Sequence, residues 1–132
     1  MLSRVRVNRR LLLDTHVFLW WQMASPDLSA DVKDAIATAD LVFISAASAW
    51  EVAIKKALGK LRLELSFEDG VESSGFEKLA IQFAHAERAG SLPPHHRDPF
   101  DRMLVAQALE EGLTLVSHDR RLEPYDAAFL WV

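Results

Sequence analysis

The stretch LLLDTHVFLWW, residues 11–21, decides the fold, because it is a mostly apolar run with a single acid, Asp14, between an expected strand and an expected helix. Leu11–Leu13 has the composition of a short buried strand, and Thr15–Ala24 has the apolar spacing of a helix. Burying Asp14 as an ion costs several kcal/mol unless another group pairs with it. The stretch therefore predicts a strand, a helix, and a partner for Asp14 where the two meet.

The rest of the chain continues this alternation of strands and helices. In the first half we expect a helix beginning after Ser29, a strand at 41–45, a helix at 46–58 ended by Gly59, and a brief strand or extended arm at 61–65. A short helix between Ser66 and Gly75, a strand at 76–81 and a helix at 83–89 ended by Gly90 should follow. The last expected elements are a helix from Pro99 to Glu111 ended by Gly112, a strand at 113–117, and an edge strand in AAFLW. Such alternation predicts an α/β fold with a central, mostly parallel, twisted sheet and helices on both faces.

The composition is that of an ordinary globular protein with one domain. Of 132 residues, 50% are hydrophobic and 26% are charged. Cysteine is absent, which excludes disulfides, thiolate zinc sites and cysteine nucleophiles and fits a reducing compartment. No apolar run approaches the ~18 residues of a membrane span, so we expect a cytoplasmic protein. Residues 1–10 carry four arginines and are expected to form a basic extension.

Four acids are candidates for chemistry, although each also has an ordinary structural explanation. Asp14 can cap the following helix, and Glu51 can pair with a lysine one turn later. Asp101 falls in the first turn of a helix that Asp98 would cap, where negative charge is favourable. Asp119 can be a turn residue bonded to its own backbone.

Considered together, these acids point to a metal ion. Asp14, Glu51, Asp101 and Asp119 each follow a strand or begin a helix, so the predicted fold places all of them near one edge of the sheet. Several carboxylates close together do not all remain ionised without a cation. Hard oxygen ligands without cysteine select Mg²⁺ or Mn²⁺, and such an ion would be the partner of Asp14.

Other catalytic sites find less support in the sequence. The five histidines show no zinc-site spacing, and the adjacent His95 and His96 are expected at the surface or behind the acids. No G-x-S-x-G elbow and no glycine-rich phosphate loop are present. The net charge of −4 gives no overall basic footprint for nucleic acid.

Four segments in order carry a family resemblance: LLLDTHVFLWW, ISAASAWEVAIKKALGKL, the LP before the histidines, and HHRDPFDRMLVAQALEEGLTLVSHD. With them the chain resembles the PIN-domain ribonucleases, specifically the VapC toxins of toxin–antitoxin pairs. The resemblance implies a PIN-like nuclease domain over residues 11–132. It implies that the catalytic, metal-binding acids are Asp14, Glu51, Asp101 and Asp119, that Asp98 is an accessory acid, and that Ser117 stands where the family often has threonine.

The resemblance also implies a function. We expect a Mg²⁺- or Mn²⁺-dependent endoribonuclease that hydrolyses RNA phosphodiester bonds with a metal-activated water and is the toxin of a toxin–antitoxin pair. Its partners would be RNA, a cognate antitoxin that covers the acidic crevice, and a second copy of the chain. The candidate phosphate contacts are Arg97, Arg102, Arg120 and Arg121, each of which can equally pair with a nearby acid.

Two alternatives remain for the function and one for the dimer. The chain can be a catalytically silent PIN-fold binding module, or a phosphatase of the haloacid-dehalogenase type. The phosphatase would need an acid two residues after Asp14, where this chain has His16. The tryptophan pair Trp20 and Trp21 is expected to anchor a homodimer, and the alternative is that both belong to the core.

Overall fold

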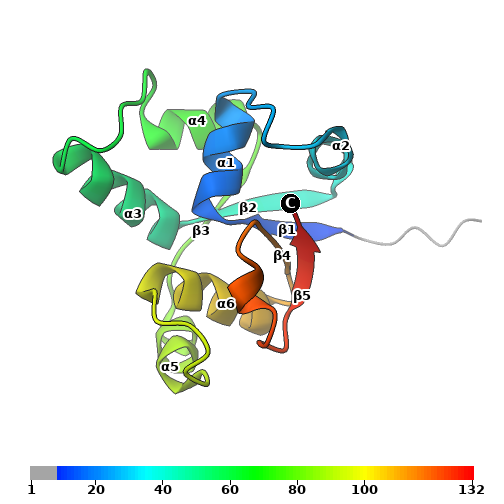
Figure 1. The fold of residues 1–132 in the computed structure, drawn as a ribbon, viewed down its shortest axis with the longest axis vertical. Coiled ribbons are helices and arrows are strands. Elements are labelled where there is room, and N and C mark those ends of the chain that lie inside the picture. The colour runs from blue at the N-terminus through cyan, green and yellow to red at the C-terminus, as the bar shows by residue number, and fades with distance from the viewer. Residues whose placement is uncertain (1–8) are drawn as a thin grey trace, which may run out of the picture.

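Five parallel strands form the central sheet of the computed structural model, which describes residues 9–132 (Figure 1). The strands are β1 (Arg10–Leu13), β2 (Leu41–Ser45), β3 (Glu77–Leu79), β4 (Thr114–Ser117) and β5 (Ala128–Trp131). Their order across the sheet is β3-β2-β1-β4-β5, and every neighbouring pair is parallel. The predicted α/β architecture is confirmed.

The strand order places a switch point between β1 and β4. Chain connections run outward from β1 through β2 to β3 on one side, whereas β4 and β5 extend the sheet on the other. In open parallel sheets, ligands bind outside the carboxyl ends of the strands at such a point. The backbone N–H of Asp14 still donates to the Val116 carbonyl at 2.9 Å, so the pairing of β1 with β4 continues to the edge of this crevice.

Helices cover both faces of the sheet, as expected. They are α1 (Thr15–Gln22), α2 (Ala30–Thr38), α3 (Ala46–Ala57), α4 (Phe67–Ser73), α5 (Phe83–Ser91) and α6 (Pro99–Glu111), with a single 3₁₀ turn at Arg120–Leu122. Figure 1 shows α1, α2 and α4 above the sheet and α5 and α6 below it. Successive side chains of β1 point to opposite faces of the sheet and so contribute to two apolar cores. Leu11 and Leu13 pack with α1, α2 and α4, whereas Leu12 packs with α3 and α6.

The helix boundaries follow side-chain caps that were expected from the sequence. Ser29, Ser66 and Asp98 each accept a hydrogen bond from a backbone N–H in the first turn of α2, α4 and α6. Pro99 occupies the first turn of α6. Gly112 ends that helix in the left-handed conformation, with φ 65°.

Two expected elements differ from the structure, and a third, left open between two alternatives, is resolved by it. Gly90 does not close α5 but lies inside it, and the helix continues to Ser91. Strand β3 covers only Glu77–Leu79 of the expected 76–81, because it lies at the sheet edge and has β2 as its only neighbour. Residues 61–65, expected as a brief strand or an extended arm, form the extended arm.

The expected basic extension, residues 1–10, lies almost wholly outside the described residues. Within the described part, Arg10 already belongs to β1, pairs in register with Leu41, and donates a hydrogen bond to the Glu111 carbonyl. Among residues 9–132, none of the helices has the length and apolar character needed to cross a membrane.

Candidate metal-binding active site

The candidate site lies at the carboxyl edge of the sheet, beside β1 and β4. Asp14 directly follows β1, Ser117 ends β4, and Asp119 comes two residues later. Helix α6 leads into the start of β4, so its own first turn, with Asp98 and Asp101, returns to the edge where β4 ends. The predicted gathering of acids at one edge follows from this parallel topology.

The partners of Asp14 in the structure are hydrogen-bond donors. Its side chain is almost fully buried, with the residue 3% exposed. Oδ1 accepts the Val17 backbone N–H at 2.8 Å and caps α1, as the structural explanation predicted. Oδ2 accepts the Ser117 hydroxyl at 2.8 Å and lies 3.1 Å from Nδ1 of His118. The hydrogen bond to Asp14 raises the pKa of His118.

Asp101 and Asp119 meet around a third residue, His96. One ligand atom of each residue lies within 4.8 Å of the other two. Nε2 of His96 is 2.8 Å from Oδ2 of Asp101 and 3.7 Å from Oδ2 of Asp119. The three side chains are only 9%, 25% and 12% exposed, in the order His96, Asp101, Asp119. This is a partly buried cluster with one nitrogen and two carboxylate ligands.

The two carboxyl groups of this cluster ionise very differently. Burial raises the pKa of Asp101 to about 6; the negative charges of Asp98 and Asp14 act in the same direction, and His96 opposes them. Arg121 lowers the pKa of Asp119 to about 2 by donating from Nε at 2.9 Å and Nη2 at 2.8 Å. At neutral pH Asp119 is therefore firmly ionised, whereas the negative charge of Asp101 is disfavoured by its surroundings.

Glu51 lies on the Asp14 side of the site. Its Oε1 accepts the hydroxyl of Thr15 at 2.7 Å, and Thr15 is the residue next to Asp14. Its Oε2 also makes the predicted ion pair with Lys55 at 3.3 Å. The ordinary explanation for Glu51 is therefore correct, and the same side chain still reaches the neighbourhood of Asp14.

Ser117 and Asp98 hold the acids in place. The Ser117 hydroxyl is fully buried, donates to Asp14, and accepts the Asp119 backbone N–H at 3.1 Å, so it links two of the predicted site acids. Oδ1 of Asp98 accepts the backbone N–H groups of Phe100 at 2.8 Å and Asp101 at 3.3 Å. Asp98 thereby fixes the helix turn that carries Asp101.

The four candidate arginines have different surroundings. Arg97 and Arg120 are exposed, and Arg120 also stacks over Trp131 at 5.0 Å. Arg121 is bound to Asp119. Arg102 donates to the Tyr125 hydroxyl and to the carbonyls of Ala89, Leu92, Pro93 and His96. These bonds commit the Arg102 guanidinium to holding a loop, so the structure does not support the phosphate contact expected for it.

The tryptophan pair of α1 belongs largely to the core. Trp20 and Trp21 are half-buried against the upper apolar cluster, and Trp21 packs on Phe76 with ring centroids 5.6 Å apart. This favours the alternative interpretation of the pair. The exposed apolar stripe lies instead on α3, one turn apart at each step: Trp50 is 63% exposed, Ile54 37% and Leu58 63%.

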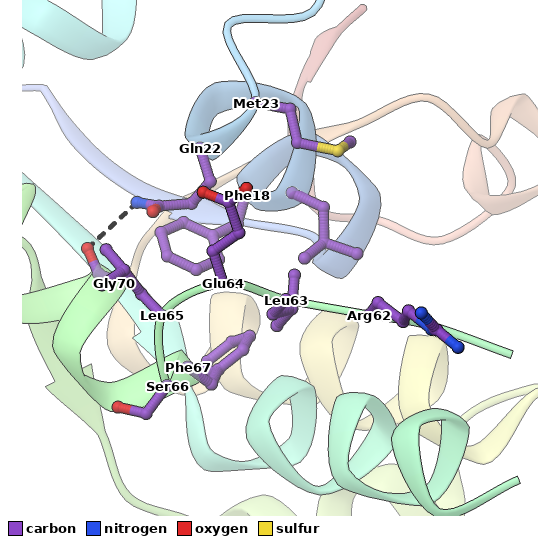
Figure 2. Close-up of a pocket in the computed structure, with 11 residues that line it drawn as sticks. Phe18, Gln22, Met23, Arg62, Leu63, Glu64, Leu65, Ser66, Phe67 and Gly70 are labelled. Atoms are coloured by element: carbon purple, nitrogen blue, oxygen red, sulfur yellow. Dashed lines mark hydrogen bonds between the residues drawn. The ribbon is translucent and has the colours of Figure 1, made fainter. Parts of the chain in front are cut away.

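A separate pocket of about 450 Å³ lies against α1, away from the acids (Figure 2). The extended arm closes it on one side with Leu63 and Leu65, and Phe18 and Phe67 form part of its apolar wall. Figure 2 shows Gln22 at its end, donating to the Gly70 carbonyl at 3.0 Å. None of the predicted site acids lines this pocket.

Comparison with known proteins agrees with the fold and shows the family. The PIN domain family model matches residues 11–128. Ribonuclease VapC22 of Mycobacterium tuberculosis is 31% identical over 118 residues, which cover 87% of this chain and 91% of that relative. The chain belongs to the PIN-domain family.

Solved structures with low sequence identity share the fold. VapBC2 from Rickettsia felis, bound to a DNA fragment from its promoter, matches with a TM-score of 0.67 at 13% identity, covering 92% of this chain and 97% of that one. A toxin–antitoxin complex from Klebsiella pneumoniae matches with a TM-score of 0.64 at 20% identity, covering 91% and 95%. FitAcB from Neisseria gonorrhoeae gives 0.64 at 18%, covering 91% and 96%.

His96 is the site residue that the sequence did not identify. The available signal was the pair of histidines just before Asp98, the residue that caps the helix bearing Asp101. This loop directly precedes the helix whose first turn carries a candidate ligand, so the loop must pass near the site. Which of the two histidines turns inward depends on the loop geometry, which has no sequence periodicity.

Proposed function

We propose that this protein is a metal-dependent endoribonuclease and the toxin of a toxin–antitoxin pair, with residues 11–132 as the nuclease domain. The observation that carries the proposal is the convergence of Asp14, Asp101 and Asp119 at the β1–β4 crevice. The support from comparison is a relative named as a ribonuclease that matches nearly the whole chain. The phosphatase alternative loses its basis, because the chain belongs to a different family.

The donor set fits a hard divalent cation. It consists of carboxylate oxygens and one imidazole, with no thiolate anywhere in the chain. Burial, together with the negative charges of Asp98 and Asp14, raises the pKa of Asp101 to about 6, and a nearby cation would offset both effects. We propose that Asp14, Glu51, Asp101 and Asp119 hold Mg²⁺ or Mn²⁺. Such an ion, when bound, lowers the pKa of a water molecule and polarises the scissile phosphate.

The chain's own residues bind and orient the RNA around these acids. Arg97 and Arg120, which are exposed, and Arg121, which is bound to Asp119, are proposed to hold phosphates on either side of the cleaved bond. Ser117 keeps Asp14 and Asp119 at a fixed separation. His118, whose pKa the Asp14 contact raises, adds a proton donor next to Asp14.

The test of this function is the Asp101→Asn variant, with Glu110→Gln on the same helix as its matched control. Asp101→Asn removes one charge from the cluster, and we expect RNA cleavage with Mg²⁺ or Mn²⁺ to fall by about 100-fold or more. Glu110 is bound to Arg88 at the surface, and its variant should cleave as the wild type does. Cleavage should stop when EDTA is added.

Asp101→Asn is a cleaner test than Asp14→Asn. An amide at position 14 would direct N–H groups toward the Ser117 hydroxyl and the His118 backbone N–H, which already donate there. Full cleavage by a folded Asp101→Asn protein contradicts the mechanism. A wild type that binds metal and RNA but does not cleave supports the silent binding module instead.

We propose an antitoxin and a second copy of the chain as protein partners, in the cytoplasm. The antitoxin is supported by structural neighbours that are toxin–antitoxin complexes. A basic side chain of the antitoxin inserted among Asp14, Asp101 and Asp119 would neutralise their charge and block the crevice. The homodimer is best supported by the exposed apolar stripe of Trp50 and Ile54 on α3 and Leu58 at its C-cap, because a two-fold dimer buries the same patch of both copies.

A further inference from the structure

We infer that Nε2 of His96 is a direct ligand of the metal ion, and that this nitrogen makes the site favour Mn²⁺ over Mg²⁺. The inference rests on the proposed function, since it concerns the same site, and it selects between the two cations that the carboxylates alone do not distinguish.

The first observation is the position of the His96 Nε2 nitrogen. Nε2 lies 2.8 Å from Oδ2 of Asp101 and 3.7 Å from Oδ2 of Asp119. Two ligand atoms bound to one ion at 2.0–2.3 Å are themselves separated by about 2.8–3.8 Å at coordination angles of about 90–109°. The nitrogen therefore already stands at ligand distance from two of the proposed metal-binding carboxylates.

The second step is the scaffold that aims the ring. The His96 backbone N–H donates to the Tyr125 hydroxyl at 3.1 Å, and the His96 carbonyl accepts from Arg102 at 3.3 Å. Tyr125 and Arg102 also both bond the Pro93 carbonyl, at 2.7 and 3.1 Å. Tyr125 itself is buried, with 4% exposure. A loop fixed at both ends in this way holds its side chain ready before a ligand arrives.

The other histidines near the site have different contacts. His95 is exposed, and its ring packs edge-on against the Tyr125 ring at 5.1 Å. His118 uses Nδ1 to contact the already capped Asp14, and His16 is exposed beside it. Among the described residues, His96 is the histidine that joins two carboxylates in a cluster able to hold an ion.

Ligand chemistry then gives the preference between cations. Mg²⁺ binds oxygen almost exclusively, whereas first-row transition metals also accept imidazole nitrogen. In the structure Nε2 of His96 lies at hydrogen-bond distance, 2.8 Å, from Oδ2 of Asp101. A neutral imidazole with its hydrogen on Nδ1 presents the Nε2 lone pair to the cation. One nitrogen among the oxygens is expected to stabilise Mn²⁺ binding more than Mg²⁺ binding.

The test is pulsed electron paramagnetic resonance of Mn²⁺ bound to the full-length, EDTA-treated protein, which reports directly bound nitrogen without requiring cleavage. We expect a ¹⁴N coupling in the wild type and in the His95→Gln control, and its loss in His96→Gln. The dissociation constant for Mn²⁺ should rise by about 10- to 100-fold in His96→Gln, with a much smaller change for Mg²⁺. Gln keeps a polar group near Asp101 but supplies no aromatic nitrogen.

Two results overturn the inference separately from the function. Wild-type protein that binds Mn²⁺ and cleaves RNA without any ¹⁴N coupling shows that His96 only positions Asp101, and this measurement needs no variant. A coupling that survives in His96→Gln assigns the nitrogen to another histidine. Wild-type protein that neither binds Mn²⁺ nor cleaves RNA overturns the proposed function together with the inference.

Discussion

At the scale of single residues, Asp101 shows the cost of partly burying a carboxylate beside other acids. Burial raises its pKa to about 6, so the folded metal-free protein disfavours the charge that a cation requires. Asp119 avoids this cost because Arg121 neutralises it. The same cluster thus contains one carboxylate whose negative charge is balanced by an arginine, and one whose negative charge is disfavoured by burial.

We predict that Asp101→Asn stabilises the metal-free protein at neutral pH by about 1–2 kcal/mol, a value discounted for partial exposure. An Asp with a raised folded-state pKa lowers stability as pH rises from its unfolded value, near 4, to about 6. The stability difference between variant and wild type should therefore be full above pH 6 and vanish toward pH 4. Chemical denaturation in EDTA at several pH values measures it.

Glu110→Gln again serves as the control, and its stability difference from the wild type should not follow this pH profile. A destabilised Asp101→Asn protein at pH 7 would show that the hydrogen bond with His96 outweighs the burial of the charge.

For single residues, the sequence predicted the roles that depend only on neighbouring positions in the chain. The caps by Asp14 and Asp98 follow from acids placed directly before helices, and the structure has both. The role of Arg102 was not predictable, because its hydrogen-bond partners come from a loop and from Tyr125, 23 residues away. The inward turn of His96 depends on those same long-range bonds.

At the scale of elements, two glycines in similar sequence positions have opposite roles. Both were expected to end helices, and Gly112 does so with φ 65°. Gly90 instead lies within α5, and a Cβ added there would meet nothing within 4 Å. Composition alone does not separate them, because the difference depends on packing: α5 runs one residue past Gly90 to Ser91, whereas Leu113, directly after Gly112, is buried in the lower core.

We predict that Gly112→Ala destabilises the protein by about 1 kcal/mol, because alanine is strained in the left-handed conformation. Gly90→Ala, the matched control, should stabilise it by about 0.5–1 kcal/mol, since alanine favours the helix and loses less entropy on folding. Thermal unfolding of the two variants beside the wild type measures both changes. Shifts of the same sign would contradict the assigned backbone conformations.

At the scale of the whole molecule, parallel topology was the most predictable feature and the edges of the sheet the least. Alternating strands and helices implied that strand ends share one edge, and this is why the acids could be grouped without coordinates. The length of β3 and the path of the arm at 61–65 depend on which sheet edge is covered, and local sequence does not encode that.

We predict that the protein is a dimer in solution and that Trp50→Glu combined with Leu58→Glu makes it a monomer. The two charges would be buried in the proposed α3 interface without partners. Light scattering coupled to size exclusion should give twice 14.9 kDa for the wild type and 14.9 kDa for the variant. Met23→Glu, an exposed apolar residue of the α1 side, should remain dimeric.

The position of the last strand has a practical consequence. The Val132 N–H donates to the Ser117 carbonyl at 2.9 Å, so Val132 lies beside the residue whose hydroxyl links Asp14 to Asp119. A polyhistidine purification tag fused after Val132 would deliver six extra imidazoles to the crevice and mimic or mask the nitrogen signal of His96. Such a tag must be removed by protease before any metal is added.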